Sequence, residues 1–161
     1  MRYFHVEMNW KTKPWTDVSR DELHAVVRLR VNVFVVEQDC PYSDLDGKDL
    51  RGWHVWAEDQ PLEKGGAVAA YARVLAPGVS YAEPSIGRVA TRQDCRGQGV
   101  GRELMERCID VCERVWPGNS VRISAQCYLE GWYEDLGFES VGETYLEDGI
   151  PHIQMLRSAR A

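Results

Sequence analysis

The sequence contains no apolar stretch long enough to cross a bilayer. Its longest uninterrupted apolar run, Ala67 to Ala72, is far shorter than the ~18 residues that a membrane-spanning helix requires. Residues 1–11 also lack the apolar segment and the small-residue cleavage site of a secretory signal peptide. We therefore expect a cytoplasmic protein that has no membrane partner.

An excess of basic residues is also absent. The 161 residues include 19 Lys and Arg against 25 Asp and Glu, which gives a formal net charge of −6. This balance excludes a generally basic protein, and we expect no nucleic-acid partner. The content of 44% hydrophobic and 27% charged residues excludes a disordered or fibrous chain. The length suits one domain whose core needs no disulfide or metal.

Cysteines are few and lack the spacing of a metal site or of a disulfide framework. There are five, an odd number, and no two form a Cys-x-x-Cys pair. Cys108 and Cys112 are one helical turn apart, but two thiolates need further metal ligands and no nearby His supplies them. We therefore predict no metal site and place both side chains on the buried face of a helix.

Hydrophobic periodicity predicts an N-terminal helix followed by a loop. Ser19 and Glu22 form the pattern of a capping box, which predicts a helix that begins there and continues to Val36. The end of this segment, residues 31–36, is rich enough in β-branched residues to suit a strand as well. An acidic loop is predicted to follow over residues 37–52.

Strands and helices are predicted to alternate along the rest of the chain. A helix is predicted over residues 101–115, where apolar residues recur at intervals of three and four, and a short one over residues 129–136 with Gly137 as its cap. Strands are predicted at residues 53–58, 67–75, 86–91 and 121–125, with a terminal hairpin of residues 138–145 and 152–156. This order favours an α/β sandwich around one mixed sheet.

A glycine-rich loop carries the clearest chemical signal. Residues 96–101 read Arg-Gly-Gln-Gly-Val-Gly between a predicted strand and a predicted helix. Glycines let the backbone approach a ligand closely, and successive amides at the positive end of a helix form an anion site suited to a pyrophosphate. Arg96 and Arg102 add positive charge. The alternative is a glycine-rich helix start that binds nothing.

Two common phosphate-binding motifs do not match this loop. Counted from Gly97, the third glycine of a dinucleotide-binding fingerprint would fall at Arg102, and a P-loop would need Lys after Gly101. The pattern that remains, R-x-x-G-x-G, resembles the coenzyme A pyrophosphate signature of the GNAT family of N-acetyltransferases.

Other segments extend the resemblance over most of residues 10–156. Residues 86–91 (Ile-Gly-Arg-Val-Ala-Thr) resemble the strand that precedes the signature, and residues 132–138 (Trp-Tyr-Glu-Asp-Leu-Gly-Phe) resemble the family's (F/W)-Y-x-x-x-G-F segment. The segments that resemble the ElaA-like branch of the family are residues 30–38, 125–126 and 147–152.

The resemblance implies the fold and the activity. The fold would be α/β, the GNAT (acyl-CoA N-acyltransferase) fold, with helices flanking a central mixed, mostly antiparallel sheet. One domain would span residues 1–161, with its core at about residues 4–157. The activity would be transfer of an acetyl group from acetyl-CoA, inserted where the sheet splays, to a primary amine of a small molecule, peptide or protein by direct attack on the thioester.

The resemblance also assigns residues to the acetyl-CoA site, and it implies no metal. These residues are Val89, Ala90, Thr91, Arg96, Gly97, Gln98, Gly99, Val100, Gly101 and Arg102. Backbone amides around Val89 and Ala90 would polarise the thioester oxygen. Tyr133 matches the family position of the acid that protonates the leaving thiolate, since a phenol with an ordinary pKa of about 10 keeps its proton at neutral pH. The alternative is that Tyr133 only packs in the core.

The general base is not identified by the sequence. Many relatives place a Glu on the strand before the loop, where this chain has Arg88. The base candidates are Glu37, His54, His152 and a water relay from backbone carbonyls, although His54 adjoins apolar residues, which is more typical of a structural histidine than of a base. Gln126 would bond the pantetheine or the acceptor, or else tie down its strand.

The acidic loop and the missing strand Glu leave alternatives open. The loop carboxylates would attract a cationic amine acceptor or would simply be solvated. The missing Glu suits a non-catalytic acetyl-CoA- or CoA-binding sensor or interaction module. A nucleotide- or dinucleotide-binding oxidoreductase domain is disfavoured by both failed glycine patterns. The expected partners are acetyl-CoA and an amine acceptor, in a monomer or homodimer.

Overall fold

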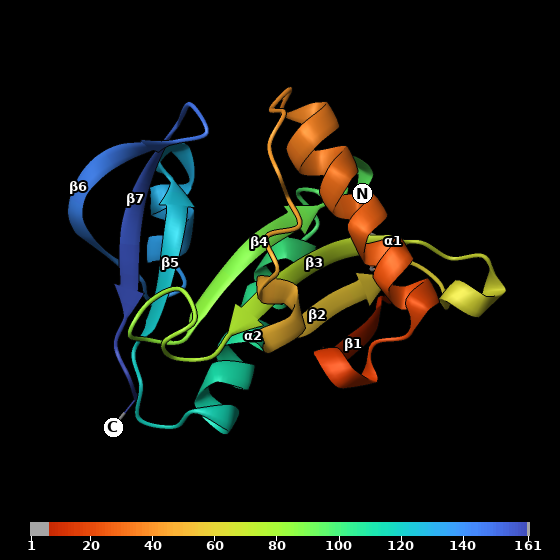
Figure 1. The fold of residues 1–161 in the computed structure, drawn as a ribbon, viewed down its shortest axis with the longest axis horizontal. Coiled ribbons are helices and arrows are strands. Elements are labelled where there is room, and N and C mark those ends of the chain that lie inside the picture. The colour runs from red at the N-terminus through yellow and green to blue at the C-terminus, as the bar shows by residue number, and fades with distance from the viewer. Residues whose placement is uncertain (1–6, 161) are drawn as a thin grey trace.

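The computed structural model describes residues 7–160, which form a seven-stranded sheet in the order β1-β2-β3-β4-β5-β7-β6 with flanking helices (Figure 1). The strands are β1 (Asn9–Pro14), β2 (Gly52–Glu58), β3 (Val68–Leu75), β4 (Ser85–Thr91), β5 (Val121–Gln126), β6 (Glu139–Glu147) and β7 (Ile150–Arg157). Neighbouring strands are antiparallel except for β4 and β5. The predicted mixed, mostly antiparallel sheet is confirmed.

The helices are α1 (Arg20–Arg30), α2 (Val100–Val115) and α3 (Glu130–Glu134). The short helical turns are η1 (Trp15–Asp17), η2 (Val31–Glu37), η3 (Lys48–Arg51), η4 (Leu62–Lys64), η5 (Gln93–Cys95) and η6 (Cys127–Leu129). Turn η3 interrupts the loop predicted over residues 37–52, and η6 with α3 replaces the single short helix predicted over residues 129–136. Gly137 has φ +90° and caps α3 as predicted. No helix of residues 7–160 has both the length and the apolar character needed to cross a membrane.

Strand β1 lies outside the predicted elements. It pairs with β2 from Asn9 opposite Glu58 to Pro14 opposite Trp53, at one edge of the sheet. Each of its residues is half-buried, because an edge strand has a single neighbour. Its sequence therefore lacks the hydrophobic alternation from which a strand is predicted, and Pro14 is acceptable at such an edge.

Helix α1 starts at the predicted capping box. The Glu22 amide donates to Ser19 Oγ (3.2 Å), and the Ser19 amide donates to Glu22 Oε2 (2.9 Å). The helix then continues into η2, which is a π-helix, so the helical alternative for residues 31–36 is confirmed. The β-branched residues that made a strand equally suitable lie in this wider turn. It is closed by bonds such as Gln38 N to Val33 O (3.2 Å).

Two hydrophobic clusters pack against the sheet. Trp56 and Tyr71 of the sheet pack with Val26 and Leu29 of α1. The alternate residues of β2 and β3 pack with α2 in the other cluster, which includes Cys108 and Cys112. Both thiols are fully buried, which confirms the prediction that they lie on the inner face of a helix. Since successive side chains of a strand point to opposite faces, α1 and α2 cover opposite sides of the sheet (Figure 1).

The sheet opens between β4 and β5. Their parallel pairing is limited to Ser85 opposite Arg122, supported by a bond from Arg122 N to Pro84 O (2.9 Å). Beyond this point the strands diverge, which leaves one hydrogen-bonding edge of β4 without a strand partner (Figure 1). An opening of this kind exposes backbone donors and acceptors in the middle of the molecule.

Candidate active site

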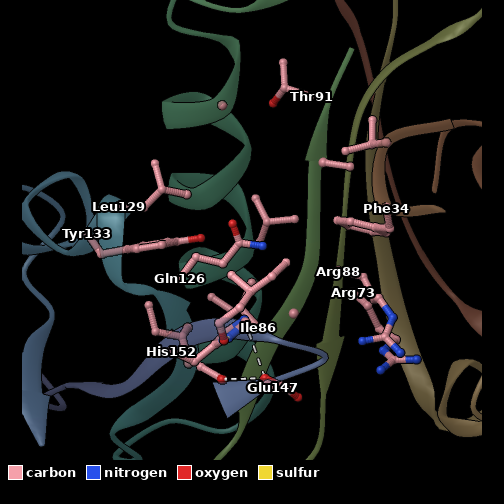
Figure 2. Close-up of a pocket in the computed structure, with 18 of the residues that line it drawn as sticks. Phe34, Arg73, Ile86, Arg88, Thr91, Gln126, Leu129, Tyr133, Glu147 and His152 are labelled. Atoms are coloured by element: carbon pink, nitrogen blue, oxygen red, sulfur yellow. Dashed lines mark hydrogen bonds and ion pairs between the residues drawn. The ribbon is translucent and has the colours of Figure 1, made fainter. Parts of the chain in front are cut away.

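A cavity of about 820 Å³ occupies the opening of the sheet. Its walls come from β4, the start of α2, the end of β5, α3, η2 and the hairpin of β6 and β7. Figure 2 shows Tyr133, Gln126 and His152 on one wall and Phe34 and Arg88 on the other. The residues that the sequence predicted for the site therefore meet in one place, with the exceptions given below.

The glycine-rich loop forms a row of free backbone donors at the start of α2. Gly97 and Gly99 have φ values of +72° and +83°, which other residues adopt only with strain. Within the described residues, the backbone amides of residues 97–102 donate no hydrogen bond. The Glu103 amide is the first in α2 that donates one, to Gly99 O (3.1 Å). Free amides and the positive helix end together fit an anion, and the identity of that anion as a pyrophosphate stays a prediction.

Most of the predicted coenzyme-binding residues line this cavity. Those that do are Val89, Ala90, Thr91, Arg96, Gly97, Gly99, Gly101 and Arg102. The side chains of Gln98 and Val100 do not: Gln98 donates to Asp94 O (2.8 Å), and Val100 packs in the core. Both residues still contribute their amides to the free row.

Arg96 and Glu37 face each other at the cavity and form a bidentate ion pair. Arg96 Nη2 lies 3.0 Å from Glu37 Oε2, Nη1 donates to Oε1, and Nε donates to Thr91 O (2.9 Å). The pair connects η2 with the glycine-rich loop across 59 positions of the chain. The carboxylate predicted as a possible base is thus already paired with an arginine.

Tyr133 packs in the core and also reaches the cavity, so its role as the acid stays a prediction. Its ring packs in the core, edge-on to Trp132 at 4.9 Å and to Phe138 at 6.1 Å between ring centres. The residue is 6% exposed, and burial raises the pKa of its phenol above the ordinary value. Its hydroxyl points into the cavity and forms no hydrogen bond with any described residue (Figure 2). A protonated, unpartnered phenol therefore faces the opening of the sheet.

A β-bulge on β4 lies across the cavity from Tyr133. Tyr71 pairs with Ala90 and Arg73 pairs with Gly87, so β4 contains one residue more than β3 in this stretch. Arg88 has φ +54° there, a conformation that costs a residue with a side chain about 1–3 kcal/mol. Its guanidinium compensates by donating to Asp44 O (3.1 Å). The bulge lies directly before Val89 and Ala90 in β4.

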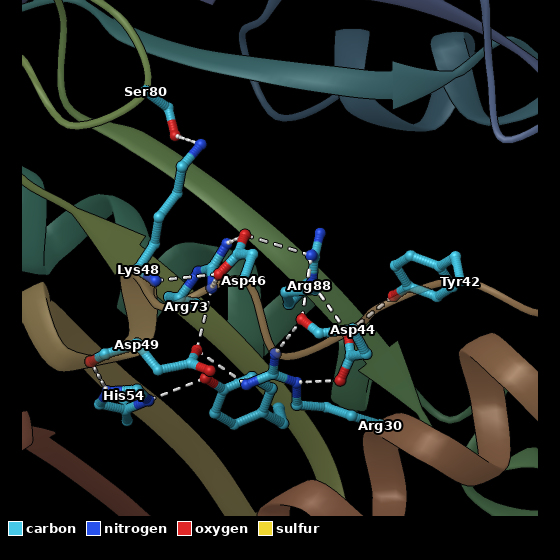
Figure 3. Close-up of polar contacts among 11 residues, drawn as sticks. Arg30, Tyr42, Asp44, Asp46, Lys48, Asp49, His54, Arg73, Ser80 and Arg88 are labelled. Atoms are coloured by element: carbon cyan, nitrogen blue, oxygen red, sulfur yellow. Dashed lines mark hydrogen bonds and ion pairs between the residues drawn. The ribbon is translucent and has the colours of Figure 1, made fainter.

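The acidic loop is only partly solvated: Glu37, Asp39 and Asp46 are exposed, as the solvated interpretation expects, whereas Asp44 and Asp49 are not. Asp44 and Asp49 are buried and paired with Arg30 at 2.8 Å each (Figure 3). Arg73 bridges Asp49 (2.9 Å) and Asp46 (2.8 Å). Burial by itself would raise the pKa of the Asp49 carboxyl, but the hydrogen bonds and charges of the two arginines outweigh it and hold the pKa below its ordinary value. Aspartates of the loop and arginines of the sheet and of α1 thus neutralise one another.

His54 belongs to this buried network and not to the cavity. It is 2% exposed, and its Nε2 lies 3.0 Å from Asp49 O while its Nδ1 lies 2.8 Å from the Tyr71 hydroxyl. A carbonyl oxygen only accepts, so Nε2 carries the proton and Nδ1 accepts from Tyr71. Burial lowers the pKa of the ring. With both nitrogens occupied and no access to the cavity, His54 is removed from the candidate bases.

His152 and Gln126 lie on neighbouring strands at the cavity wall. They are paired across β5 and β7, and both line the cavity. His152 Nδ1 lies 2.7 Å from Ile150 O and therefore carries a proton, while Nε2 lies 3.6 Å from Glu147 Oε2. Of the side chains predicted as possible bases, His152 is the one that reaches the cavity without an arginine partner. Within the described residues, no group of three or more His, Cys, Asp or Glu is arranged to hold a metal ion.

Comparison with known proteins identifies the family. A family model described as an acetyltransferase (GNAT) domain matches residues 36–158. Protein ElaA of Escherichia coli K12 is 40% identical over 154 residues, 93% of this chain and 96% of that protein. Among solved structures, an acyl-CoA N-acyltransferase from Pseudomonas aeruginosa has a TM-score of 0.86 at 42% identity, and E. coli ElaA has 0.85 at 37%; both comparisons cover 94% of this chain and 100% of the other. A relative named ElaA is found both among the curated proteins and among the solved structures. The chain therefore belongs to the GNAT acetyltransferase family, whose members transfer acyl groups from acyl-CoA.

Proposed function

We propose that this protein is an acetyl-CoA-dependent N-acetyltransferase that transfers the acetyl group to a primary amine by direct attack on the thioester. The observation that carries the proposal is the row of free amides at residues 97–102 beside the open edge of β4, with the Tyr133 hydroxyl in the same cavity. Donors for an anion, a backbone edge for an amide-containing arm and a proton donor are the groups that such a cosubstrate needs.

Binding is assigned to the backbone. The amides of residues 97–102 and the positive end of α2 hold the pyrophosphate, and the free edge of β4 bonds to the pantetheine arm. The bulge at Arg88 directs the Val89 and Ala90 amides toward the thioester oxygen. Donors fixed in this way stabilise the negative charge that develops on that oxygen during attack.

The chemical step needs two proton transfers. The amine nitrogen forms a bond to the carbonyl carbon, the carbon–sulfur bond breaks, and the sulfur leaves as a thiolate. Tyr133 donates its phenolic proton to that sulfur, and the raised pKa keeps the phenol protonated until then. His152 accepts the proton of the amine at Nε2, directly or through water, because Glu37 is held by Arg96 and His54 is buried elsewhere.

Two measurements test this function against its alternative. We expect acetyl-CoA and CoA to raise the melting temperature, and NAD and ATP to do so much less. We then expect some members of a panel of primary amines to release free CoA thiol from acetyl-CoA. Stabilisation by CoA without thiol release from any amine would instead support the non-catalytic sensor. The absence of a carboxylate on β4 favours that alternative.

A further inference from the structure

The charges at the acceptor end of the cavity do not cancel. Three arginines of the network (Arg30, Arg73 and Arg88) face three aspartates (Asp44, Asp46 and Asp49) within ion-pair distance. Lys48, which begins η3 in the same loop, has no carboxylate within ion-pair distance among the described residues. It is a surplus positive charge beside an otherwise balanced cluster.

Lys48 is placed where a ligand can reach it. It lines the cavity and is half-buried, and its Nζ donates to the Ser80 hydroxyl at 2.8 Å. Figure 3 shows the side chain extended away from the arginine–aspartate network toward Ser80, in the loop between β3 and β4. An ammonium group has three donors, and one neutral hydroxyl leaves the charge uncompensated.

An exposed carboxylate without a Lys or Arg partner among the described residues also lines the cavity. Glu147, at the end of β6, accepts from Ser124 Oγ (3.1 Å) and lies 3.6 Å from His152 Nε2. Lys48 and Glu147 line the same cavity, together with Tyr81, which follows Ser80 in the chain. The positive and the negative group thus face one cavity.

We propose, on the basis of the acetyltransferase function above, that the acceptor is a small primary amine that also carries a carboxylate. Its amino group lies at Glu147 and His152, and its carboxylate binds Lys48. The amino group of such a molecule pairs with Glu147, and its carboxylate pairs with Lys48, each by charge-assisted hydrogen bonds. An amine without an anionic group leaves Lys48 unpaired. The acceptor class follows from the charges of the two walls.

Matched amines test the proposal on the unmodified protein. Glycine, β-alanine, 4-aminobutyrate and 6-aminohexanoate are each compared with the corresponding carboxamide, which has the same length and no charge at that end. Thiol release from acetyl-CoA is measured at fixed pH and ionic strength. We expect kcat/KM to be about 10- to 100-fold higher for the acid than for the amide at the best length, the effect of one charge-assisted hydrogen bond.

Variants then assign the two ends. Lys48→Met removes the charge and keeps the length of the chain, and it should abolish the preference for the acid over the amide. Glu147→Gln should lower kcat/KM for the acid and the amide by the same factor. Lys64→Met is the matched control, at an exposed lysine of η4 outside the cavity lining. It should change neither the preference for the acid nor kcat/KM. Melting temperatures confirm that each variant is folded.

The outcomes separate this proposal from the function on which it rests. Equal or lower activity with the acids, with the amides still acetylated, would overturn the carboxylate-bearing acceptor and leave the acetyltransferase standing. A preference that survives in folded Lys48→Met would overturn the role of Lys48. Absence of thiol release with every amine, charged or neutral, would overturn the acetyltransferase function and the acceptor class with it.

Discussion

At the scale of single residues, the side chains of the cavity differ in how firmly their neighbours already hold them. The Tyr133 hydroxyl has no partner among the described residues, whereas Arg96 and Glu37 hold each other. A group without a partner is available for chemistry, and a paired one must exchange its partner to act on a ligand. This difference decides what a substitution at each position reveals.

Replacing Tyr133 by Phe removes the proton donor and keeps the ring that packs against Trp132 and Phe138. We expect kcat to fall about 10²- to 10⁴-fold, the usual contribution of a positioned acid. The affinity for acetyl-CoA should change little, since the proton is needed only as the thiolate forms. A structural tyrosine would show the reverse, a lower melting temperature with near-normal kcat, and that result in the Tyr133→Phe enzyme would remove the residue from the mechanism.

Arg96→Ala tests whether this guanidinium leaves Glu37 to bind phosphate. If it does, CoA binding measured by calorimetry should weaken by ~1.5–3 kcal/mol, the range for a charge-assisted hydrogen bond. The binding free energy of desulfo-CoA should fall by the same amount in this variant, because the thiol is remote from the pyrophosphate. Glu37→Gln is the matched control: it frees Arg96 and should preserve or strengthen binding. Equal weakening by both variants would show that the ion pair only connects η2 to the loop.

At the scale of elements, backbone geometry carries the site. The loop before α2 depends on two left-handed glycines, and β4 depends on a bulge with Arg88 at positive φ. In the loop, the conformation leaves the amides of residues 97–102 without backbone partners among the described residues. Arg88 is held by contacts with Asp44 and Asp46, so the network extends to the strand that lines the cavity.

Gly99→Glu should abolish most binding of acetyl-CoA. A Cβ at residue 99 would meet no atom within 4 Å, so the change costs the strain of a side chain at φ +83° but causes no clash, and it places a carboxylate in the anion site. We expect an affinity loss of about tenfold or more, since a favourable charge-assisted contact is replaced by repulsion.

Gly118→Glu is the matched control, because Gly118 has a similar φ of +80°, equally open space and a position after the far end of α2. It should cost similar stability and leave binding intact. Unchanged acetyl-CoA affinity in a folded Gly99→Glu protein would contradict the pyrophosphate assignment.

At the scale of the whole molecule, the arginine–aspartate network joins segments that are distant in the chain. It ties α1, the acidic loop, β3 and β4 together on the side of the opened sheet (Figure 3). The pKa values of Asp46 and Asp49 are held below their ordinary values because hydrogen bonds and charges of arginines outweigh the effect of burial. Their contribution to stability is therefore present above the unfolded pKa and is lost as pH falls through the folded pKa.

Asp49→Asn tests this network by its effect on stability and on acid denaturation. At neutral pH we expect the free energy of unfolding to drop by about 3–5 kcal/mol, because two buried arginines lose a shared partner. Below the ordinary pKa of 3.8, the wild type should lose stability more steeply than the variant. Asp110→Asn, in an exposed pair with Arg114, is the control and should cost less than about 1 kcal/mol. Equal losses in the two variants, by urea denaturation, would contradict the network's role.

Local patterns in the sequence determined much of this protein. The capping box at Ser19, the stripe of α2 and the cap at Gly137 are settled by residues within a few positions of one another, and the structure confirms them. The glycine-rich loop and the segment around Tyr133 are likewise identified by short local motifs. These elements were predictable because local hydrogen bonds and periodic burial depend on neighbours in the chain.

Only the tertiary structure decided which charged groups are free. Glu37 and His54 look like equal candidates in the sequence, yet one is paired with Arg96 and the other is enclosed by Asp49 and Tyr71. The acidic loop reads as solvated until the arginines of distant elements are placed against it, and Lys48 becomes a surplus charge only once those pairs are counted. The energy of a charge depends on its burial and on its partners in space, and neither is encoded by the spacing of residues along the chain.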